Sequence, residues 1–494
     1  MTKQTTFTPS KQQQQLFDWV KNGTGSCILE SVAGSGKTTT LLHAMEYMKG
    51  KIFYGAFNKR VCDELKEKVD VGVNVNISTM HSAGLSALKK QSRFAKVEMY
   101  KVNNIFRKLF ERSDPVYKYQ QQVVQLVSLA KSYGFGIFKE IEDEKNWLDL
   151  IIKHEVRCSN NPFNEDTKNI IKAAIECFDE SNECSDDFID FDDMIYLPLL
   201  KNIKPFQYDW VLIDEAQDSN AIRRELALRM LKPGGRMICV GDSNQAIYGF
   251  SGADSDSMQL FQDELQGTEL SLTVSYRCPV DVVTYSQQWV PHINSHPTAI
   301  KGSVLDIPTH NMLQRLRISD VVLCHRNAPL LKTAYSLLIN GTPARVEGRE
   351  IGTTITNMAN RFKAVKSFVD FINKITTATN KDIQDLRNEG KVTTADQLED
   401  TLSCLLSIVD KIRNDGADSN HIGEAISKEV DKLFGDDVGD DVVKLTTIYK
   451  AKGREWPCVF WIKHKIDQHN YEDVRKLSYV AATRAKSELY VVID

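Results

Sequence analysis

The sequence lacks the features of an exported or membrane protein. Its first 22 residues are polar and rich in glutamine, unlike a secretory signal. No apolar run approaches the roughly 18 residues that a membrane-spanning helix needs. The ten cysteines contain no CxxC pair, so we expect reduced thiols in a cytoplasmic protein without membrane contact. An iron–sulfur or zinc site on Cys158, Cys177 and Cys184 is the alternative interpretation of the cysteines.

The chain also lacks an excess of positive charge. Its 62 Lys and Arg and 66 Asp and Glu give a formal net charge of −4, so any nucleic acid would have to be bound by a local groove. Residues 442–486 are locally basic, with ten Lys and Arg against four Asp and Glu, although on charge alone a solvated face is the simpler explanation. With 42% hydrophobic and 26% charged residues, the composition is that of an ordinary globular protein of about three or four domains.

A glycine-rich segment near the N-terminus has the sequence of a phosphate-binding loop. Ser31-Val-Ala-Gly-Ser-Gly-Lys-Thr38 follows the apolar run Cys27-Ile-Leu29 and precedes a stretch that can start a helix. In this strand–loop–helix context, backbone N–H groups bind phosphates, a lysine reaches the β- and γ-phosphates of ATP, and a hydroxyl binds Mg²⁺. Ser31 replaces the first glycine of the GxxxxGK(S/T) pattern. The residues that we expect to bind nucleotide are Ala33, Gly34, Ser35, Gly36, Lys37, Thr38 and Thr39, with Thr38 also on the metal.

A second segment joins an apolar strand to two acids. Val211-Leu-Ile213 runs directly into Asp214-Glu-Ala-Gln-Asp218. So short an apolar run is typical of a buried parallel strand, and open α/β sheets bind ligands at the carboxyl ends of their strands. We expect Asp214 to hold Mg²⁺ and Glu215 to orient or deprotonate a water. The second acid and Gln217 favour a motor that hydrolyses ATP on contact with a track over a simple kinase or GTPase.

Strand-like and helical patterns alternate along the chain. Strand-like runs occupy residues 26–30, 51–57, 75–80, 211–213, 236–240 and 269–274 of a first α/β region. A second region has them at residues 320–324, 344–347, 442–447, 458–462 and 488–493. This texture predicts parallel sheets, and two such regions suggest a two-lobed motor with nucleotide between the lobes.

Two polar stretches of helical period interrupt the sheets, so we predict four parts. Residues 1–85 and 190–275 form the first sheet domain, and residues 276–351 and 441–494 form the second. Residues 86–189 form a helical insertion with one apolar face, made by Val102, Ile105, Phe106, Leu109 and Phe110. Residues 352–440 form a second, shorter insertion that ends in a linker at residues 435–441. Its apolar stripe is Phe362, Val365, Phe368, Val369 and Ile372.

The series of motifs resembles the UvrD/Rep-like superfamily 1 DNA helicases from residue 7 to the C-terminus. Thr8-Pro-Ser-Lys-Gln-Gln13 resembles the adenine-reading Q motif of that family, with Gln13 or Gln12 in the role because four consecutive glutamines blur the register. The other matching segments are residues 56–59, 78–82, 190–193, 214–218, 241–250, 274–277, 445–455 and 479–485. Each motif alone is weak, but this many in the family's order is specific.

The resemblance implies two RecA-like parallel-sheet motor domains, each interrupted by a mainly helical insertion, with ATP and Mg²⁺ as cofactors. Arg277 and Arg484 would contact the γ-phosphate from the second domain, and Gln245 would sense it. Tyr276 would stack on adenine, and Glu455 would bond the ribose. An arginine finger contributes on the order of 10³–10⁵ in rate. Outside these motifs, a surface salt bridge would be the simpler explanation of each arginine.

The resemblance also implies a single-stranded DNA track. Phe57, Tyr248 and Phe250 would stack on bases, which contributes about 1–3 kcal/mol per base and tolerates any sequence. Without the motif context, Phe57 and Phe250 could equally be ordinary core residues. The other expected DNA contacts are Asn58, Thr79 and His81. His81 has no metal-ligand partner at suitable spacing, so we assign no metal to it.

Several positions depart from the family pattern. Ser251 stands where the family usually has Arg, Phe250 replaces the commoner Trp, and Tyr449 stands where His is usual. These changes would alter DNA contacts without removing the ATP chemistry. The second insertion is shorter than the regulatory domain of the long helicases, and little after Glu347-Gly-Arg-Glu350 matches the family.

We therefore expect an ATP-dependent DNA helicase that moves 3′ to 5′ on single-stranded DNA and unwinds duplex, in replication, repair or recombination. Its expected partners are single-stranded DNA, duplex junctions and replication or recombination proteins. One alternative is a translocase that mainly strips bound proteins from DNA, which the short second insertion motivates. Another is a non-motor binding module that ATP switches. The intact set of Asp214, Glu215, Arg277 and Arg484 argues against that last hypothesis.

Overall fold

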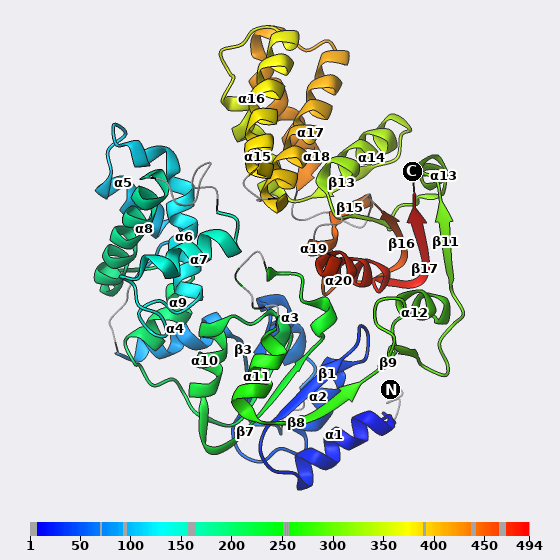
Figure 1. The fold of residues 1–494 in the computed structure, drawn as a ribbon. Coiled ribbons are helices and arrows are strands. Elements are labelled where there is room, and N and C mark those ends of the chain that lie inside the picture. Colours follow the sequence, from blue (N-terminus) through cyan, green and yellow to red (C-terminus); the bar gives the residue numbers. More distant parts are fainter. Residues whose placement is uncertain are drawn as a thin grey trace. The chain divides into compact units, whose positions relative to one another are not determined.

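The chain folds into two compact units, Met1–Thr273 and Val274–Asp494 (Figure 1). This computed structural model describes residues 7–69, 72–91, 96–156, 165–249, 252, 254, 256–388, 392–435, 441–463 and 471–493. Each unit contains a large parallel sheet and a mainly helical segment inserted into it. The predicted fold class, two RecA-like domains with helical insertions, is confirmed. The exact bounds of the insertions stay a prediction.

The first unit is built on six parallel strands in the order β3-β2-β6-β7-β1-β8. The strands are β1 (Cys27–Ser31), β2 (Ile52–Ala56), β3 (Val75–Thr79), β6 (Tyr208–Ile213), β7 (Leu231–Gly241) and β8 (Thr268–Leu272). Leu29 of β1 lies opposite Val240 of β7 and Leu270 of β8. Because the strands are parallel, their carboxyl ends lie along one edge, where open α/β sheets bind ligands.

Helices cover both faces of this sheet, which explains its nearly continuous apolar strands. Successive residues of a strand face opposite sides, so Leu29, Leu212 and Val240 pack in one core and Phe53 and Val211 in the other. The first core includes α1 (Lys11–Asn22), α2 (Lys37–Met45) and α3 (Lys59–Lys66). The second core includes α10 (Ala221–Arg229), α11 (Ser257–Leu265) and the inserted helices.

The helical insertion of the first unit shares this second core rather than forming its own. Its elements are α4 (Met80–Gln91), β4 (Lys96–Val97), α5 (Lys101–Leu109), α6 (Gln120–Ser132), α7 (Glu144–Lys153), α8 (Glu165–Glu183), β5 (Phe188–Ile189) and α9 (Asp193–Leu200). On the predicted apolar face, Val102, Ile105 and Phe106 are buried, and Phe110 packs against them. The prediction for Leu109 was wrong: α5 ends at this residue, and its side chain is 37% exposed.

Two buried lysines hold the segment that returns from this insertion. Lys131 Nζ lies 2.8 Å from Asp190 Oδ2 and 2.7 Å from Asp193 Oδ1, and Lys101 Nζ lies 2.7 Å from Asp193 Oδ2. The two aspartates also accept each other's backbone N–H. Burial alone would lower the pKa of Lys131, but Asp190 and Asp193 outweigh it and raise that pKa. Lys131 therefore stays a cation although its side chain is fully buried.

The second unit contains seven parallel strands in the order β11-β17-β16-β12-β15-β13-β14. The strands are β11 (Ser303–Ile307), β12 (Val321–Cys324), β13 (Ala344–Glu347), β14 (Phe434–Gly435), β15 (Val443–Thr447), β16 (Trp456–Ile462) and β17 (Ala485–Val492). All five strands predicted here are present. Two strands were missed: β11, an edge strand whose residues are mostly half-buried or exposed and which pairs with β17, and the short β14, which pairs with β13 and includes Gly435 of the predicted linker.

Four longer helices form the insertion of the second unit: α15 (Arg349–Asn360), α16 (Phe368–Asn388), α17 (Val392–Asn414) and α18 (Ile422–Leu433). They form the yellow and orange bundle of Figure 1 and share one core with α14 (Asn327–Ile339) and the sheet. The other elements are β9 (Val274–Ser275), α12 (Val280–Ser286), β10 (Asn294–Ser295), α13 (Thr309–Arg315), α19 (Ile448–Ala451) and α20 (Tyr471–Ala482).

The predicted apolar stripe of this insertion was partly wrong. Because α16 begins at Phe368, Phe362 and Val365 precede the helix, although both pack against the core. Val369 is 61% exposed. The buried positions of α16 recur every three or four residues, as helical period requires: Phe371, Ile375, Thr379, Ile383 and Leu386. Residues 436–440 of the predicted linker lie outside the described residues.

The described part of the chain contains nine cysteines, which do not include Cys158, and all nine are free thiols. Among the described residues there is no group of three or more His, Cys, Asp or Glu placed to hold a metal ion. A helix long and apolar enough to cross a membrane is also absent from those residues.

Candidate functional site

The loop between β1 and α2 has the backbone of a phosphate-binding loop. Gly34 and Gly36 have φ angles of 70° and 76°, a region that favours glycine. Helix α2 begins at Lys37, and no side chain caps its first N–H groups. Those N–H groups can therefore bind an anion. The buried Ser35 hydroxyl has no hydrogen-bond partner among the described residues, as expected of a group that a ligand would satisfy.

Lys37 lies among acids that follow two neighbouring strands, β6 and β7. Its Nζ is 3.4 Å from Glu215 Oε2. Burial disfavours the charged lysine, but Glu215, Asp242 and Asp214 outweigh burial and raise the pKa of Lys37. The ammonium group is therefore held as a cation beside the loop that would receive phosphates.

Asp214 is buried at the carboxyl end of β6. Its two carboxylate oxygens accept hydrogen bonds from the Tyr54 hydroxyl at 2.8 Å and from the backbone N–H of Glu215 at 2.9 Å. Burial, followed by the charge of Glu215, raises the pKa of Asp214 to about 6. The Thr38 side chain also hydrogen-bonds Tyr54. Tyr54 thus connects the two residues predicted to hold Mg²⁺. Sequence reasoning missed it, because a tyrosine within an apolar strand gives no functional signal.

A chain of hydrogen bonds runs from Glu215 to Gln245. Glu215 Oε2 accepts from Gln217 Nε2 at 2.6 Å, and Gln217 Oε1 accepts from the backbone N–H of Asp242 at 3.1 Å. The Asp242 carboxylate accepts from Gln245 Nε2 at 2.6 Å. Glu215 itself has φ 52° and ψ 42°, a left-handed conformation that costs on the order of 1–3 kcal/mol for such a residue. Strain of this size is typical of functional sites.

The two glutamines of the Q motif have different surroundings. Gln13 is 3% exposed; its Oε1 accepts from the backbone N–H of Ser10 at 2.9 Å, and its Nε2 donates to Thr40 Oγ1 at 2.9 Å. Gln12 contacts Thr273, accepting from its backbone N–H at 2.9 Å and donating to its hydroxyl at 3.0 Å. Gln13 therefore joins α1 to the phosphate-loop helix, and Gln12 joins α1 to the end of β8. Which of them contacts adenine stays a prediction.

Two of the aromatic residues predicted to bind DNA lie close together. Phe57 follows β2 and is 44% exposed. Its ring lies nearly parallel to that of Tyr248, with 6.0 Å between the centroids and 10° between the planes. Phe250 and Ser251 lie outside the described residues.

The predicted polar DNA contacts begin helices at the same edge of the sheet. The Asn58 side chain accepts from the backbone N–H of Val61 and caps α3. Thr79 Oγ1 accepts from the backbone N–H of Ser82 at the start of α4. Both residues stand where β2 and β3 end, at the edge of the sheet that also carries Lys37 and the acids.

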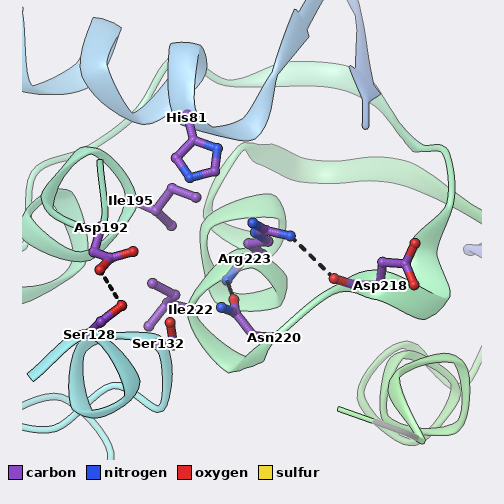
Figure 2. Close-up of a pocket in the computed structure, with 9 residues that line it drawn as sticks. All are labelled: His81, Ser128, Ser132, Asp192, Ile195, Asp218, Asn220, Ile222 and Arg223. Atoms are coloured by element: carbon purple, nitrogen blue, oxygen red, sulfur yellow. Dashed lines mark hydrogen bonds between the residues drawn. The ribbon is translucent and has the colours of Figure 1, made fainter. Parts of the chain in front are cut away.

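His81 lines a polar pocket of about 100 Å³ within the first unit (Figure 2). Burial, followed by the charge of Arg223, lowers the pKa of His81 to about 4. The imidazole is therefore neutral near pH 7 and can give a ligand a hydrogen bond rather than a charge. The other polar groups of the pocket are Ser128, Ser132, Asp192, Asp218, Asn220 and Arg223.

In the second unit, Arg277 and Glu455 form an ion pair. Arg277 Nε lies 2.5 Å from Glu455 Oε2, and Lys486 Nζ lies 3.2 Å from Glu455 Oε1. Burial raises the pKa of Glu455, but Arg277 and Lys486 outweigh it and hold that pKa below its ordinary value. Tyr276, next to Arg277, is 44% exposed.

Arg484 lies near this pair, where the chain enters β17. Its Nε donates to the Val480 carbonyl at 2.9 Å, and one terminal nitrogen donates to the Arg454 carbonyl at 3.2 Å. The side chain is almost fully buried within the unit. Arg277 donates to the Thr483 carbonyl, directly before Arg484, at 3.5 Å. The structure therefore brings the two predicted arginine fingers together within the second unit.

The fold and the first of these sites define a class of protein. A glycine-rich loop between a strand and a helix, with a buried lysine facing acids at the end of a neighbouring parallel strand, is the site of a P-loop nucleoside triphosphatase. Comparison with known proteins gives the family.

The chain belongs to the UvrD/REP helicase family. The UvrD/REP helicase N-terminal domain matches residues 10–266, more than half of the chain, and the UvrD-like helicase C-terminal domain matches residues 443–492. The resemblance predicted from the motifs is confirmed.

Similar curated proteins carry helicase names. A probable DNA helicase II homolog of Mycoplasma pneumoniae is 25% identical over 321 residues, which cover 59% of this chain and 44% of that protein. The ATP-dependent DNA helicase Rep of Escherichia coli is 27% identical over 300 residues, which cover 54% of this chain and 40% of Rep. The chain thus spans less than half the length of these relatives.

Proposed function

We propose that the protein is an ATP-dependent DNA helicase that moves along single-stranded DNA and unwinds duplex. The observation that carries the proposal is the hydrogen-bond chain from Glu215, beside Lys37, through Gln217 and Asp242 to Gln245. It connects acids suited to hydrolysis with the segment that leads to Tyr248, beside the exposed ring of Phe57. The names of the similar proteins support this proposal.

The residues of the first unit fit ATP and Mg²⁺. Backbone N–H groups from Ala33 to Thr39 and the Lys37 ammonium group would bind the phosphates. Thr38 and Asp214, both hydrogen-bonded to Tyr54, would hold Mg²⁺. A bound Mg²⁺ neutralises charge that develops on the phosphates. Glu215 would orient or deprotonate the attacking water, and its strained backbone fixes the carboxylate next to Lys37.

The second unit would supply the remaining groups. Arg277 and Arg484 would stabilise charge on the γ-phosphate, where an arginine finger contributes on the order of 10³–10⁵ in rate. Tyr276 would stack on adenine, and Glu455 would bond the ribose. Glu455 and Arg277 would then exchange their mutual ion pair for contacts to the nucleotide.

The DNA track would pass the edge of the first sheet where β2 and β3 end. Phe57, Tyr248 and Phe250 would stack on bases, and Asn58, Thr79 and His81 would contact the strand. The 3′ to 5′ direction, a role in replication, repair or recombination, and partners among replication or recombination proteins belong to the same proposal. The proposal also includes a cytoplasmic location.

ATP hydrolysis with and without single-stranded DNA tests the proposal. We expect single-stranded DNA to stimulate hydrolysis, and we expect Lys37→Ala to reduce the stimulated rate by at least about 100-fold, because the variant loses a charge that would stabilise the transferring phosphoryl group. Lys66→Ala, at an exposed lysine of the same unit, is the matched control and should retain activity. A wild-type rate that DNA leaves unchanged, or that RNA raises as strongly as DNA, would count against a DNA motor.

A further inference from the structure

The pocket beside His81 is a built polar site that the ATP chemistry does not use. His81 comes from α4, Ser128 and Ser132 from α6, and Arg223 from α10, so the sheet domain and its insertion both contribute to it. Asp192 comes from the segment that returns from the insertion. Figure 2 shows Asp192 and Arg223 on opposite sides of the pocket, with His81 above them.

Arg223 supplies hydrogen-bond donors to this pocket. One of its terminal nitrogens donates to the Asp218 carbonyl at 3.2 Å. Within the described part of the chain, this is the one hydrogen bond that its side chain makes. A guanidinium group carries five N–H donors in a rigid planar fork. Most of these donors are therefore available to a ligand that presents acceptors.

Asp192 supplies acceptors from the opposite side. Ser128 Oγ donates to its Oδ2 at 2.6 Å, and its Oδ1 accepts no hydrogen bond from the described residues. Ile195 and Ile222, each 2% exposed, form apolar walls between the two polar sides (Figure 2). The pocket thus has donors, acceptors and apolar faces.

These features select a neutral planar ligand. A phosphate would meet two aspartates, Asp192 and Asp218, against a single guanidinium, so its charge would be poorly compensated. A base edge carries both acceptors and donors, and arginine and acidic side chains are common partners for them. A cavity of about 100 Å³ is small, so it has room for at most one base ring rather than for a larger group.

We propose that this pocket receives a single nucleobase of the single strand, with Arg223 donating to its acceptors and Asp192 accepting from its donors. The inference rests on the proposed function, because it takes single-stranded DNA as the ligand. It adds a subsite that would hydrogen-bond the edge of one base to a track made of stacking aromatics and the polar residues Asn58 and Thr79. Arg223 and Asp192 would then make the grip on DNA depend on the base at one position of the strand.

A double-mutant cycle that combines protein substitutions with abasic sites in the DNA tests whether the pocket binds a base. The probe is a tailed duplex with a thymidine tail of the polarity that stimulates ATP hydrolysis, bound with a non-hydrolysable ATP analogue so that the junction fixes the register. Each tail nucleotide in turn is replaced by an abasic residue, and the dissociation constant is measured. In the wild type we expect one tail position, apart from the positions where stacking is lost, at which an abasic residue weakens DNA binding about tenfold. In Arg223→Gln an abasic residue at that position should cause no such loss of affinity.

Two further variants separate a bound base from general charge or folding. Arg223→Lys keeps the charge but not the planar fork, so it should lose the position-specific effect as Arg223→Gln does. Ser132→Val narrows the pocket without changing Arg223, so it should also lose the dependence of binding on the base at that tail position. This variant tests the proposal if Arg223→Gln does not fold. The proposal is overturned if all three variants keep the affinity loss at that tail position, or if the wild type has no tail position whose effect depends on Arg223. Failure of the wild type to bind any tail rejects the proposed function instead.

Discussion

Among single residues, Asp192 is a carboxyl group whose surroundings oppose its charge. Burial and the neighbouring Asp190 raise the pKa of Asp192 to about 6, although Ser128 and Lys131 favour the ionised form. Arg223, His81 and Asp218 face it across the pocket. A carboxyl group with a higher pKa in the folded state binds its proton more tightly there than in the unfolded chain. Its contribution to stability is therefore favourable at low pH and is lost as the pH rises from about 4 through about 6.

Asp192→Asn should remove this pH-dependent cost. The asparagine keeps an oxygen that can accept from Ser128 but carries no charge. At pH 8 we expect its free energy of unfolding to exceed that of the wild type by about 2 kcal/mol, and we expect the gap to shrink between pH 6 and pH 4. Urea unfolding of both proteins across this range measures the gap. A gap that stays constant with pH would show that the carboxyl group titrates as an ordinary aspartate.

At the scale of elements, the ionic network of Lys101, Lys131, Asp190 and Asp193 connects inserted helices to the segment before α9. Burying these charges is costly, and their mutual hydrogen bonds offset that cost only while every member is present. Lys131 comes from α6 and Lys101 from α5, so the network ties two inserted helices to one turn of chain. That turn also carries Asp192 of the pocket. The network therefore sets where the insertion lies on the first sheet.

Removal of one charge from this network should be expensive. Lys131→Met keeps a long apolar side chain but leaves Asp190 without its cation and Asp193 with Lys101 alone. We expect the variant to lose about 3–5 kcal/mol of stability in the first unit, because carboxylates remain buried without compensation. The midpoint of urea unfolding measures the loss. Lys108→Met is the matched control: Lys108 pairs with Glu180 at the same 2.7 Å distance but is 71% exposed, so its midpoint should barely move. Equal shifts in both variants would contradict this account.

The elements that could be predicted from the sequence are those whose local pattern and burial agree. The strands β1, β2 and β6 are short apolar runs buried on both faces, so the sequence shows them plainly. The edge strands β3 and β11 mix polar and apolar residues and are mostly half-buried or exposed; β3 was predicted, and β11 was missed. On α16 the stripe was displaced because Phe371, not Val369, faces the core. Apolar residues near a helix start do not by themselves show where the helix begins.

Some residues of the candidate site could likewise be predicted from the sequence, and others could not. Lys37, Asp214 and Glu215 stand in motifs that indicate phosphate chemistry, and Gln245 was predicted from the family resemblance; the fold brings all four to one edge of the first sheet. Tyr54 could not be predicted, because its role depends on strand pairing that places β2 beside β6. Arg223 was missed for a similar reason, because Ser128, Ser132 and Asp192 of the pocket come from distant parts of the sequence.

At the scale of the whole molecule, the second insertion is part of its unit rather than a separate lobe. Its helices share a hydrophobic core with the second sheet. Asp400 of α17 also accepts from the backbone N–H groups of Asn327 and Ala328 at 2.7 and 2.9 Å, where α14 begins. The four helices therefore share both a hydrophobic core and a helix cap with the second sheet and its α14.

The direction of movement can be tested on the whole molecule with tailed duplexes. A motor loaded on a single-stranded tail displaces the duplex only if it travels toward the junction, so a 3′ to 5′ motor should act on 3′-tailed duplexes and leave 5′-tailed ones intact. Strand displacement with ATP measures this, and Lys37→Ala should abolish it. Displacement only from 5′ tails would contradict the direction. A wild type that removes a protein block from a 3′ tail with hardly any displacement would instead favour the stripping translocase.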